Sequence, residues 1–254
     1  TQADRNRFEE FMKKHEKFFE SIQTSYPNPK LPDWSKLSIK LKEGTVPWQS
    51  RAYPLNELKK KALQEIITQQ LRKGIIKPSS SPFSLPCFLV PKSQAGKFRL
   101  VVDGRKLNAA IEKSSWPIPR INEIIDRFHG AKYFSTIDLA DGFHQIGLVE
   151  ECSKYTAFVT EVGLYEQNTC PQGLSTSPNH YQYVMERILG GLGGVTSSAT
   201  ESSTNLIGKD CYIYIDDCII WSNTIEEHLE KLQRVVTRLS SFGLRAKSPK
   251  VQLG

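Results

Sequence analysis

The chain has 254 residues, 39% of them hydrophobic and 24% charged, so it is long enough to bury a full core and ordinary in composition for a globular protein. No stretch approaches the run of about 18 apolar residues that spans a membrane, and we therefore expect no membrane partner. Five scattered cysteines without a Cys-x-x-Cys pair indicate neither a zinc site nor a disulfide framework, and they favour a reducing, intracellular compartment.

The net charge of +7 is unevenly distributed along the chain. Residues 1–110 carry 21 Lys and Arg against 10 Asp and Glu, whereas residues 111–254 carry 13 against 17. A basic half joined to an acidic half is expected where one half contacts phosphates and the other holds metal ions. A solvated basic face is the alternative, and charge alone does not separate the two.

Helical periodicity and turn residues predict the elements of the N-terminal part. Residues 1–24 follow an amphipathic helical pattern and lead into a proline-rich passage. Residues 55–73 repeat apolar side chains at the helical period, and Gly74 is placed to end that helix. Two strands are expected at 87–90 and 98–102, joined by a short turn.

The next elements are a short helix over 119–128 and a strand over 133–138. Four apolar side chains are expected on the buried side of the helix: Ile121, Ile124, Ile125 and Phe128. A longer helix should begin near Ser177, with Ser177 as its N-cap and Pro178 in its first turn.

A polar, Ser/Thr-rich stretch at 195–205 is expected to form a loop. The last helix is predicted from a capping box of Thr224 and Glu227, and Gly243 is placed to end it. Because helices and antiparallel strands alternate without a regular βαβ rhythm, the predicted fold class is α+β.

Two adjacent carboxylates, Asp216 and Asp217, follow Tyr214-Ile215 between two apolar runs, which indicates a tight hairpin with acids at its tip. Aspartate is depleted in strands, and like charges about 4 Å apart repel by roughly 4 kcal/mol at an effective dielectric near 20. A divalent metal would offset that repulsion, because hard cations bind carboxylate oxygens and keep phosphate and water as further ligands. A solvated Asp-Asp turn is the simpler alternative.

Asp138 is a third carboxylate, placed at the end of the predicted strand 133–138. In α/β sheets ligands gather at the carboxyl ends of strands, so Asp138 can lie beside Asp216 on a neighbouring strand. A carboxylate cluster that acts on phosphate-bearing substrates is the protein component of two-metal phosphoryl and nucleotidyl transfer.

Five motifs lie along the chain in order: Ile75-Ile76-Lys77-Pro78-Ser79-x-Ser81-Pro82, Phe98-Arg99-x-x-x-Asp103-x-Arg105-x-Leu107-Asn108, Phe134-Ser135-Thr136-Ile137-Asp138-Leu139, Pro171-Gln172-Gly173-Leu174 and Tyr214-Ile215-Asp216-Asp217. With these motifs the chain resembles the reverse transcriptases of retroviruses and LTR retrotransposons, most of all the gypsy type. The resemblance runs from about Leu37 to the C-terminus. Each motif alone is weak, but five in the same order are specific.

The resemblance implies a right-hand polymerase with fingers and palm subdomains, the palm being an antiparallel sheet packed with helices. On this basis residues 1–36 are an N-terminal helix and proline-rich lead-in, 37–132 are mainly fingers and 133–254 mainly palm, with the two subdomains interleaved. The thumb and ribonuclease H domains of full-length relatives are not expected within this sequence. Such domains, together with an integrase, are expected partners as parts of a longer pol polyprotein.

In such enzymes Asp138, Asp216 and Asp217 would be the catalytic carboxylates, and the backbone carbonyl of Leu139 would complete a metal shell. The implied cofactors are two Mg²⁺ or Mn²⁺ ions. The implied partners are a dNTP and an RNA or DNA template with its primer.

The resemblance also implies a set of nucleotide-binding residues: Lys92, Arg99, Asp141, Gly142, Phe143 and Gln172. Lys92 and Arg99 would clamp the triphosphate, Asp141 and Gly142 would offer backbone N–H groups to it, and the Phe143 ring would exclude a ribose 2′-hydroxyl. Gly173 and Tyr214 would contact nucleic acid. The simpler alternatives are exposed cations, a plain turn, a core phenylalanine and a structural loop glycine.

Three further residues have less specific interpretations. Lys247 and Lys250 fall where the family carries a palm lysine near the phosphates, with a solvated charge as the alternative for each. His144 follows the Asp138 motif but has no Cys or His partner at ligand spacing, so it is interpreted as structural.

Two other functions stay open at this point. The first is a catalytically silent nucleic-acid-binding or assembly domain derived from a retroelement, which the absent thumb favours and the intact carboxylates disfavour. The second is another two-metal nucleotidyltransferase, which the fingers motifs disfavour.

Overall fold

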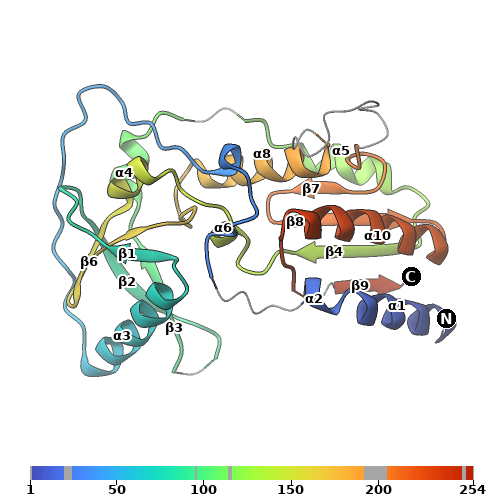
Figure 1. Ribbon diagram of the computed structural model, residues 1–254, viewed down its shortest axis with the longest axis horizontal. Coiled ribbons are helices and arrows are strands. Elements are labelled where there is room, and N and C mark those ends of the chain that lie inside the picture. The colour runs from blue at the N-terminus through green and yellow to red at the C-terminus, as the bar shows by residue number, and fades with distance from the viewer. Residues whose placement is uncertain are drawn as a thin grey trace. The chain divides into compact units, whose positions relative to one another are not determined.

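The computed structural model describes residues 2–19, 25–94, 96–113, 116–191, 205–247 and 250–253. The chain forms two compact units, each assembled from separate stretches of sequence. Unit 1 contains Thr1–Gln23, Ser115–Gly142 and Pro178–Gly254, and unit 2 contains Thr24–Ser114 and Phe143–Ser177. Each unit combines a sheet with helices, which confirms the predicted α+β class (Figure 1).

Unit 2 is built on a five-stranded sheet with the order β1-β6-β5-β2-β3. Only the β2/β5 pair is parallel; the other neighbours are antiparallel. Its strands are β1 (Ile76–Pro78), β2 (Leu85–Pro91), β3 (Phe98–Val102), β5 (Phe158–Thr160) and β6 (Gly163–Gln167). Its helices are η1 (Asp33–Ser35), α3 (Glu57–Arg72), α4 (Arg105–Ala110), α7 (Glu150–Ser153) and η3 (Lys154–Thr156), and α6 (Gly142–Gln145) starts at the unit boundary.

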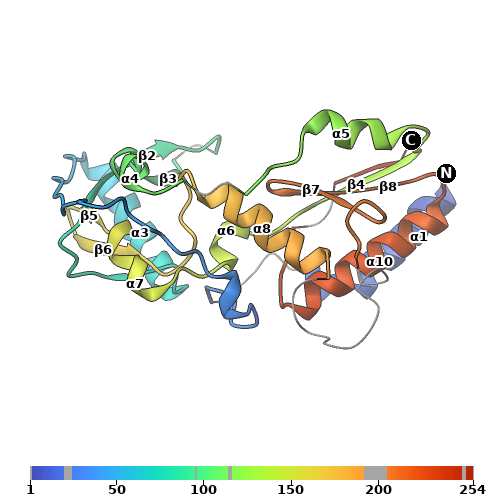
Figure 2. The same ribbon diagram turned by 90° about the horizontal axis from the view of Figure 1, so that it is seen from above.

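Unit 1 is built on a four-stranded antiparallel sheet with the order β7-β8-β4-β9. Its strands are β4 (Tyr133–Asp138), β7 (Tyr212–Tyr214), β8 (Asp217–Ser222) and β9 (Lys250–Leu253). Its helices are α1 (Gln2–Lys14), α2 (Glu16–Phe19), α5 (Ile121–Ile125), η2 (Asp126–Phe128), α8 (Ser177–Leu189) and α10 (Ile225–Ser241). In Figure 2, α5 lies on one side of this sheet, and α8 and α10 lie on the other.

One face of the unit 1 sheet is a closed core. Alternate residues of β4 and β8, namely Ser135, Ile137, Cys218, Ile220 and Ser222, are buried. The buried His228 of α10 joins both strands to the helix, because its Nε2 lies 2.7 Å from Ser135 Oγ and its Nδ1 lies 3.0 Å from Ser222 Oγ. Burial lowers the pKa of His228 to about 4, so this ring is neutral at pH 7.

On the opposite face of the same sheet, aromatic side chains gather at one end. There Phe128 of η2 contacts Phe134 and Trp221, and Trp221 stacks on Tyr212. Because side chains alternate along a strand, Asp138 shares this face with Phe134, and Asp217 shares it with Trp221. The two carboxylates therefore lie on the same face as the aromatic cluster, at the other end of β4 and β8.

The predicted elements agree with the structure except at their ends. Of the four side chains predicted to be buried on helix 119–128, Ile124 is buried, Phe128 is half-buried, and the side chain of Ile121 lies outside the described set. Gly74 (φ +74°) follows α3, and Thr224 caps α10 by accepting the Glu227 N–H. Ser177, predicted as the N-cap of α8, is the first residue of that helix, and its hydroxyl donates to the Pro171 carbonyl. Ile125 is 54% exposed, so its predicted burial is wrong; α5 ends at Ile125 and the chain tightens into η2, which breaks the helical period on which the prediction rested.

Most of the polar loop predicted at 195–205 lies outside the described residues, as do residues 20–24 of the N-terminal helix. In the part of the chain that the structure describes, no helix has the length and apolarity needed to cross a bilayer. All five cysteines are buried thiols.

Candidate active site

The acidic hairpin has the shortest connection that antiparallel strands allow. Tyr214 pairs with Asp217, so only Ile215 and Asp216 form the turn. Ile215 has φ +54°, a left-handed conformation that β-branched residues avoid and that costs on the order of 1 to 3 kcal/mol. The surrounding structure must hold this turn in place.

Gln182 of α8 is that support. Its fully buried side chain bonds to the strand that enters the turn and to the turn itself: Nε2 donates to the Ile213 carbonyl at 3.1 Å, and Oε1 accepts the Ile215 N–H at 2.9 Å. The same Nε2 also lies 2.7 Å from Glu186 Oε1. A buried amide that satisfies two backbone groups of a strained turn fixes its conformation. The sequence did not predict this role of Gln182, because a glutamine on an amphipathic helix carries no local signal of a contact with a distant turn.

A second support lies where the chain enters β7. The Arg234 guanidinium of α10 donates to both carboxylate oxygens of the buried Asp210, at 3.1 and 2.7 Å. This forked pairing raises the pKa of Arg234 and ties the start of the hairpin to α10.

Asp138 completes the acidic group from the neighbouring strand. It is the last residue of β4 and pairs directly with Asp217, the first residue of β8. Directly opposed residues in an antiparallel pair have Cβ atoms about 5 Å apart. The structure thus brings Asp138 together with the adjacent Asp216 and Asp217, which lie far from it in the sequence, as the strand pattern predicted.

The electrostatics of the site reflect this crowding. Partial desolvation, followed by the charges of Asp138 and Asp217, raises the pKa of Asp216, whereas the Lys247 ammonium lowers it. Tyr181 of α8 is buried, and burial together with all three carboxylates raises the pKa of its phenol well above the usual value. Tyr181 therefore stays neutral beneath a strongly negative site.

Among the described side chains, Lys247 is the cation that pairs with the acidic group. Its Nζ lies 2.8 Å from Asp138 Oδ2, and its backbone N–H donates to the Asp138 carbonyl at 2.9 Å. The neighbouring backbone continues this pairing, since Ala140 N–H donates to the Arg245 carbonyl and Leu139 forms a bridge with Ala246. The side chain of Lys250, the other lysine considered, lies outside the described set.

The donor set suits a hard divalent cation, because carboxylate oxygens without His or Cys favour Mg²⁺ or Mn²⁺. Within the described ranges, however, no three Asp, Glu, His or Cys side chains already converge at the spacing of a metal site. The ligand types fit two such ions, whereas the Asp138 carboxylate is held by a lysine.

Asp141 and Gly142 form the turn that follows β4. Asp141 has φ +48° and an exposed side chain. A Cβ at Gly142 would lie 2.8 Å from the Tyr181 hydroxyl, so this position excludes larger residues for packing reasons whatever its role toward phosphate. Leu139 is buried beside this turn.

Lys92 and Arg99 belong to a separate hairpin in unit 2. Arg99 lies on β3 opposite Val90, and Lys92 follows β2, with its N–H donating to the Lys97 carbonyl. Both side chains are exposed, and neither forms an ion pair with a residue that the structure describes. Five other cations of this unit pair with a described carboxylate, among them Lys40 with Glu112 and Lys77 with Glu166. The remaining cations of the unit, like Lys92 and Arg99, have no described ion pair.

The Gln172-Gly173 loop, also in unit 2, is held by a residue whose role the sequence did not reveal. Asn108 Nδ2 donates to the Gly173 carbonyl at 3.0 Å, and Asn108 Oδ1 accepts the Ser175 N–H at 2.8 Å. Gln172 and Gly173 are exposed, and Gly173 has φ +92°, which only glycine adopts without strain. The terminal Asn of the second motif thus supports the fourth motif.

Phe143 and Tyr214 are both half-buried. Phe143 starts unit 2 and lies on α6, so it is not part of the fully buried core. Tyr214 is the last residue of β7, directly before the acidic turn. His144 Nδ1 lies 3.1 Å from the Thr169 hydroxyl, as suits a structural role.

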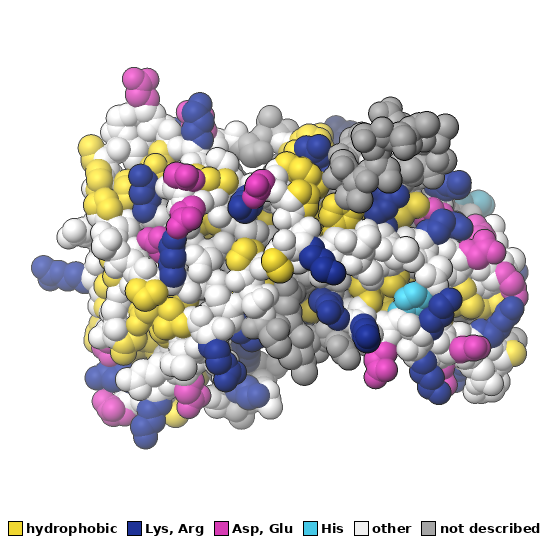
Figure 3. Space-filling model, viewed as in Figure 1, with side chains coloured by type: hydrophobic (Ala, Val, Ile, Leu, Met, Phe, Trp, Pro, Cys, Tyr) yellow, Lys and Arg dark blue, Asp and Glu magenta, His cyan; other side chains and the backbone are white. Residues whose placement is uncertain are grey.

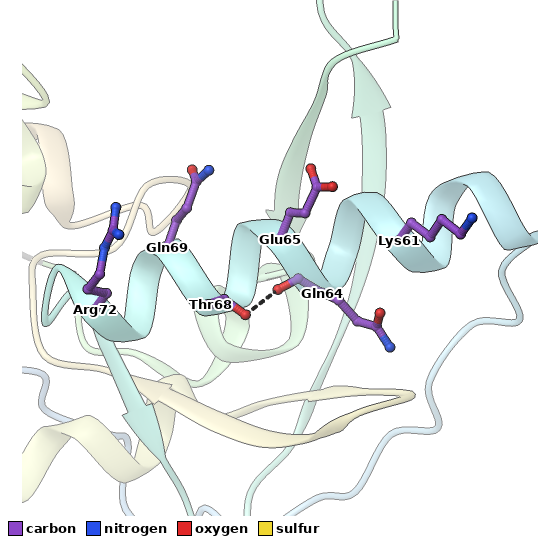
Figure 4. Close-up of a pocket in the computed structure, with 6 residues that line it drawn as sticks. All are labelled: Lys61, Gln64, Glu65, Thr68, Gln69 and Arg72. Carbon is purple, nitrogen blue, oxygen red and sulfur yellow. Dashed lines mark hydrogen bonds between the residues drawn. The ribbon is translucent and has the colours of Figure 1, made fainter.

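Two surface features lie apart from the carboxylates. A shallow depression of about 420 Å³ on α3 is lined by the exposed side chains of Lys61, Gln64, Glu65, Thr68, Gln69 and Arg72 (Figure 4). These belong to one helix and form its solvated polar face. On the face shown in Figure 3, described Lys and Arg side chains are interspersed with Asp and Glu.

Comparison with known proteins identifies the family. The model of the family described as reverse transcriptase (RNA-dependent DNA polymerase) matches residues 90–254, which contain all three carboxylates and their supports. The chain belongs to this family.

Individual relatives show which members of the family the chain is similar to. The chain is 37% identical over 210 residues to the retrovirus-related Pol polyprotein from transposon 297 of Drosophila melanogaster, covering 81% of this chain and 18% of that protein. It is 33% identical to the corresponding polyprotein from transposon gypsy of the same organism, covering 81% and 19%. It is 29% identical to the enzymatic polyprotein of Cauliflower mosaic virus (strain Strasbourg), covering 95% and 34%. The predicted gypsy-type resemblance is confirmed, and the chain spans about a third or less of these relatives.

Solved structures show the same fold. Prototype foamy virus protease-reverse transcriptase superposes with a TM-score of 0.79 at 22% identity, covering 100% of this chain and 31% of that one. The foamy viral protein in complex with an RNA/DNA hybrid gives 0.77 at 23% identity, covering 97% and 31%. These likenesses confirm the predicted α+β polymerase fold.

Proposed function

We propose that the chain is the fingers and palm region of an RNA-directed DNA polymerase, which adds dNTPs to a primer 3′-hydroxyl by two-metal nucleotidyl transfer. The observation that carries this proposal is the placement of Asp138 opposite Asp217, with Asp216 on the adjoining turn held by Gln182. A repulsive acidic group on a supported, strained turn is costly unless cations bind there.

The proposed ligands are the carboxylates of Asp138, Asp216 and Asp217 and the backbone carbonyl of Leu139. Members of this family use divalent metal ions, and the oxygen donors of this chain suit Mg²⁺ or Mn²⁺. When bound, two such ions would activate the primer hydroxyl and neutralise the leaving pyrophosphate. The supported hairpin would hold the carboxylates in place, so that little reorganisation is needed during the reaction.

The nucleotide-binding roles follow from the family resemblance and are assigned residue by residue. Lys92 and Arg99 are exposed cations without described partners, which leaves both free to bind a triphosphate. The backbone N–H groups of Asp141 and Gly142 would also bind it, and Gln172 would contact the incoming nucleotide. The half-buried Phe143 would select against the ribose 2′-hydroxyl.

Gly173 and Tyr214 are the proposed contacts to a primed RNA or DNA template. A foamy viral relative of the same fold was solved with an RNA/DNA hybrid and another complex contains double-stranded DNA, which supports this choice of partner. The relatives in transposons are polyproteins, which supports thumb, ribonuclease H or integrase domains as covalent or assembled partners.

Primer extension tests the proposal. The chain is incubated with dNTPs and Mg²⁺ on primed RNA and DNA templates, with and without EDTA, beside the Asp138→Asn and Asp216→Asn variants. Extension that EDTA and both variants abolish supports the proposal. Extension retained by either variant contradicts the metal-ligand assignment, and template binding without any extension would indicate the catalytically silent alternative.

A further inference from the structure

Lys247 contacts Asp138 through both its backbone and its side chain. The lysine lies outside the sheet strands, yet its backbone is fixed against Asp138 by the paired residues 138–140 and 245–247. The ammonium therefore starts from an anchored Cα and reaches the carboxylate at 2.8 Å. The side chains of both residues are about half exposed, 53% for Lys247 and 49% for Asp138, so the pair can open into solvent.

We propose that Lys247 is an internal counter-ion that holds Asp138 in the metal-free protein and competes with a divalent cation for it. This inference deepens the proposed function and rests on its metal site. Lys247 acts here as a positioning residue: metal binding at Asp138 requires the ammonium to move away from Oδ2, and the protein loses this ion pair when the ion binds.

Three points support competition between Lys247 and a divalent cation for Asp138, rather than an ion pair without effect on metal binding. Three carboxylates lie together at one edge of the sheet, and among the described side chains Lys247 is the cation that contacts one of them, Asp138. Within the described residues the acidic side chains do not yet converge as a metal site, while one of them is engaged by the ammonium. Finally, a lysine ammonium has three donors on a flexible stem, so it can release a carboxylate without a change of backbone.

The expected effect is modest, because exposed ion pairs are weak. Removal of the competing ammonium should tighten divalent binding about two- to fivefold, the range that corresponds to a half-exposed pair. Lys247→Met removes the charge and keeps a side chain of similar length. Lys247→Arg keeps the charge and should leave the affinity near that of the unmodified protein.

Lys132→Met is the matched control for net charge. Lys132 is exposed and precedes β4, so it lies roughly 20 Å from Asp138 along the same strand. This variant changes the total charge by the same amount and leaves the contact with Asp138 intact. Its Mn²⁺ affinity reports the contribution of net charge alone.

The experiment measures Mn²⁺ binding to the metal-free chain by the EPR signal of free Mn²⁺, with no nucleic acid or nucleotide present. We expect Lys247→Met to bind Mn²⁺ two- to fivefold more tightly than both Lys132→Met and Lys247→Arg. In EDTA, Lys247→Met should also melt at a lower temperature than Lys132→Met, because the carboxylates lose their counter-ion, and Mn²⁺ should raise its melting temperature more.

Asp138→Asn separates the two proposals. If Asp138→Asn and Asp216→Asn bind Mn²⁺ as tightly as the unmodified chain, the metal site of the proposed function fails. If they bind more weakly but Lys247→Met equals Lys132→Met, only the counter-ion role is overturned. If the gain of Lys247→Met persists when combined with Asp138→Asn, it does not act through this contact, and the proposal is again overturned.

Discussion

At the scale of single residues, three carboxylates at one end of the unit 1 sheet carry charges that the fold must tolerate. Asp216 has the clearest signature, because desolvation and the neighbouring Asp138 and Asp217 raise its pKa. A raised carboxyl pKa means that ionisation is less favourable in the folded state than in the unfolded state. The metal-free site is therefore less stable above the unfolded pKa, near 3.9, than below it.

Asp216→Asn should consequently stabilise the metal-free protein at pH 7. Because the side chain reaches solvent, we expect a gain of less than about 1 kcal/mol. The stabilisation should shrink as the pH falls through the raised pKa and disappear below the unfolded-state pKa, near 3.9, because Asp216 is then protonated in both states. Urea unfolding of both proteins in EDTA at several pH values measures the difference, and a less stable Asn variant at pH 7 would contradict the repulsion.

Phe143 provides a residue-scale test of sugar selection. If its ring excludes a 2′-hydroxyl, Phe143→Val should raise kcat/KM for a ribonucleotide relative to the matched deoxynucleotide, because space opens beside the sugar. If Phe143 is purely structural, the substitution should instead lower the stability by roughly 1 to 3 kcal/mol and leave the ratio of the two kcat/KM values unchanged. Steady-state kinetics with one dNTP/rNTP pair and thermal melts distinguish the two.

At the scale of elements, α8 supports the acidic hairpin through a single buried amide. Gln182→Leu should leave the Ile213 carbonyl and the Ile215 N–H without their partner, at a cost of about 2 to 4 kcal/mol. Primer extension should fall as well, because the strained turn loses its restraint. The control is Gln64→Leu on the exposed face of α3, which should change stability by less than about 0.5 kcal/mol. Equal stability of the two variants would contradict the proposed support of the turn by Gln182.

His228 joins α10 to β4 and β8 as a neutral ring. Its pKa of about 4 lies below the unfolded value near 6.5, so the unfolded chain binds more protons in between, and stability should fall as the pH drops from about 6.5 to 4. The loss should reach up to about 3 kcal/mol. Denaturation curves across this range should show the dependence, and it should persist in His129→Gln, whose ring is exposed, but weaken in His228→Gln.

At the scale of the whole molecule, the uneven charge predicts how template binds. Most cations of unit 2, including the exposed Lys92 and Arg99, have no described ion-pair partner. Affinity for a primed template should be weak and should fall steeply between about 50 and 200 mM salt, because phosphate contacts release counter-ions. A titration at several salt concentrations tests this, and tight binding with no salt dependence would show that the grip is not electrostatic.

Local sequence patterns determined much of this protein. The helical period and Gly74 predicted α3, the capping box predicted the start of α10, and the Asp-Asp pair between apolar runs predicted the β7/β8 hairpin. These features depend on neighbours within a few residues, and such interactions can be read from the sequence. The five motifs further indicated the family and the three carboxylates.

Only the tertiary structure decided how these parts meet. The order β7-β8-β4-β9 places Asp138 opposite Asp217, the buried Gln182 reaches the turn from a helix, and Lys247 reaches Asp138 from a segment more than 100 residues later. The exposure of Ile125 also depends on how η2 packs, which its own periodicity does not reveal. Contacts between distant residues depend on the packing of the whole unit, because burial and strand pairing select among local patterns that are equally satisfied in isolation.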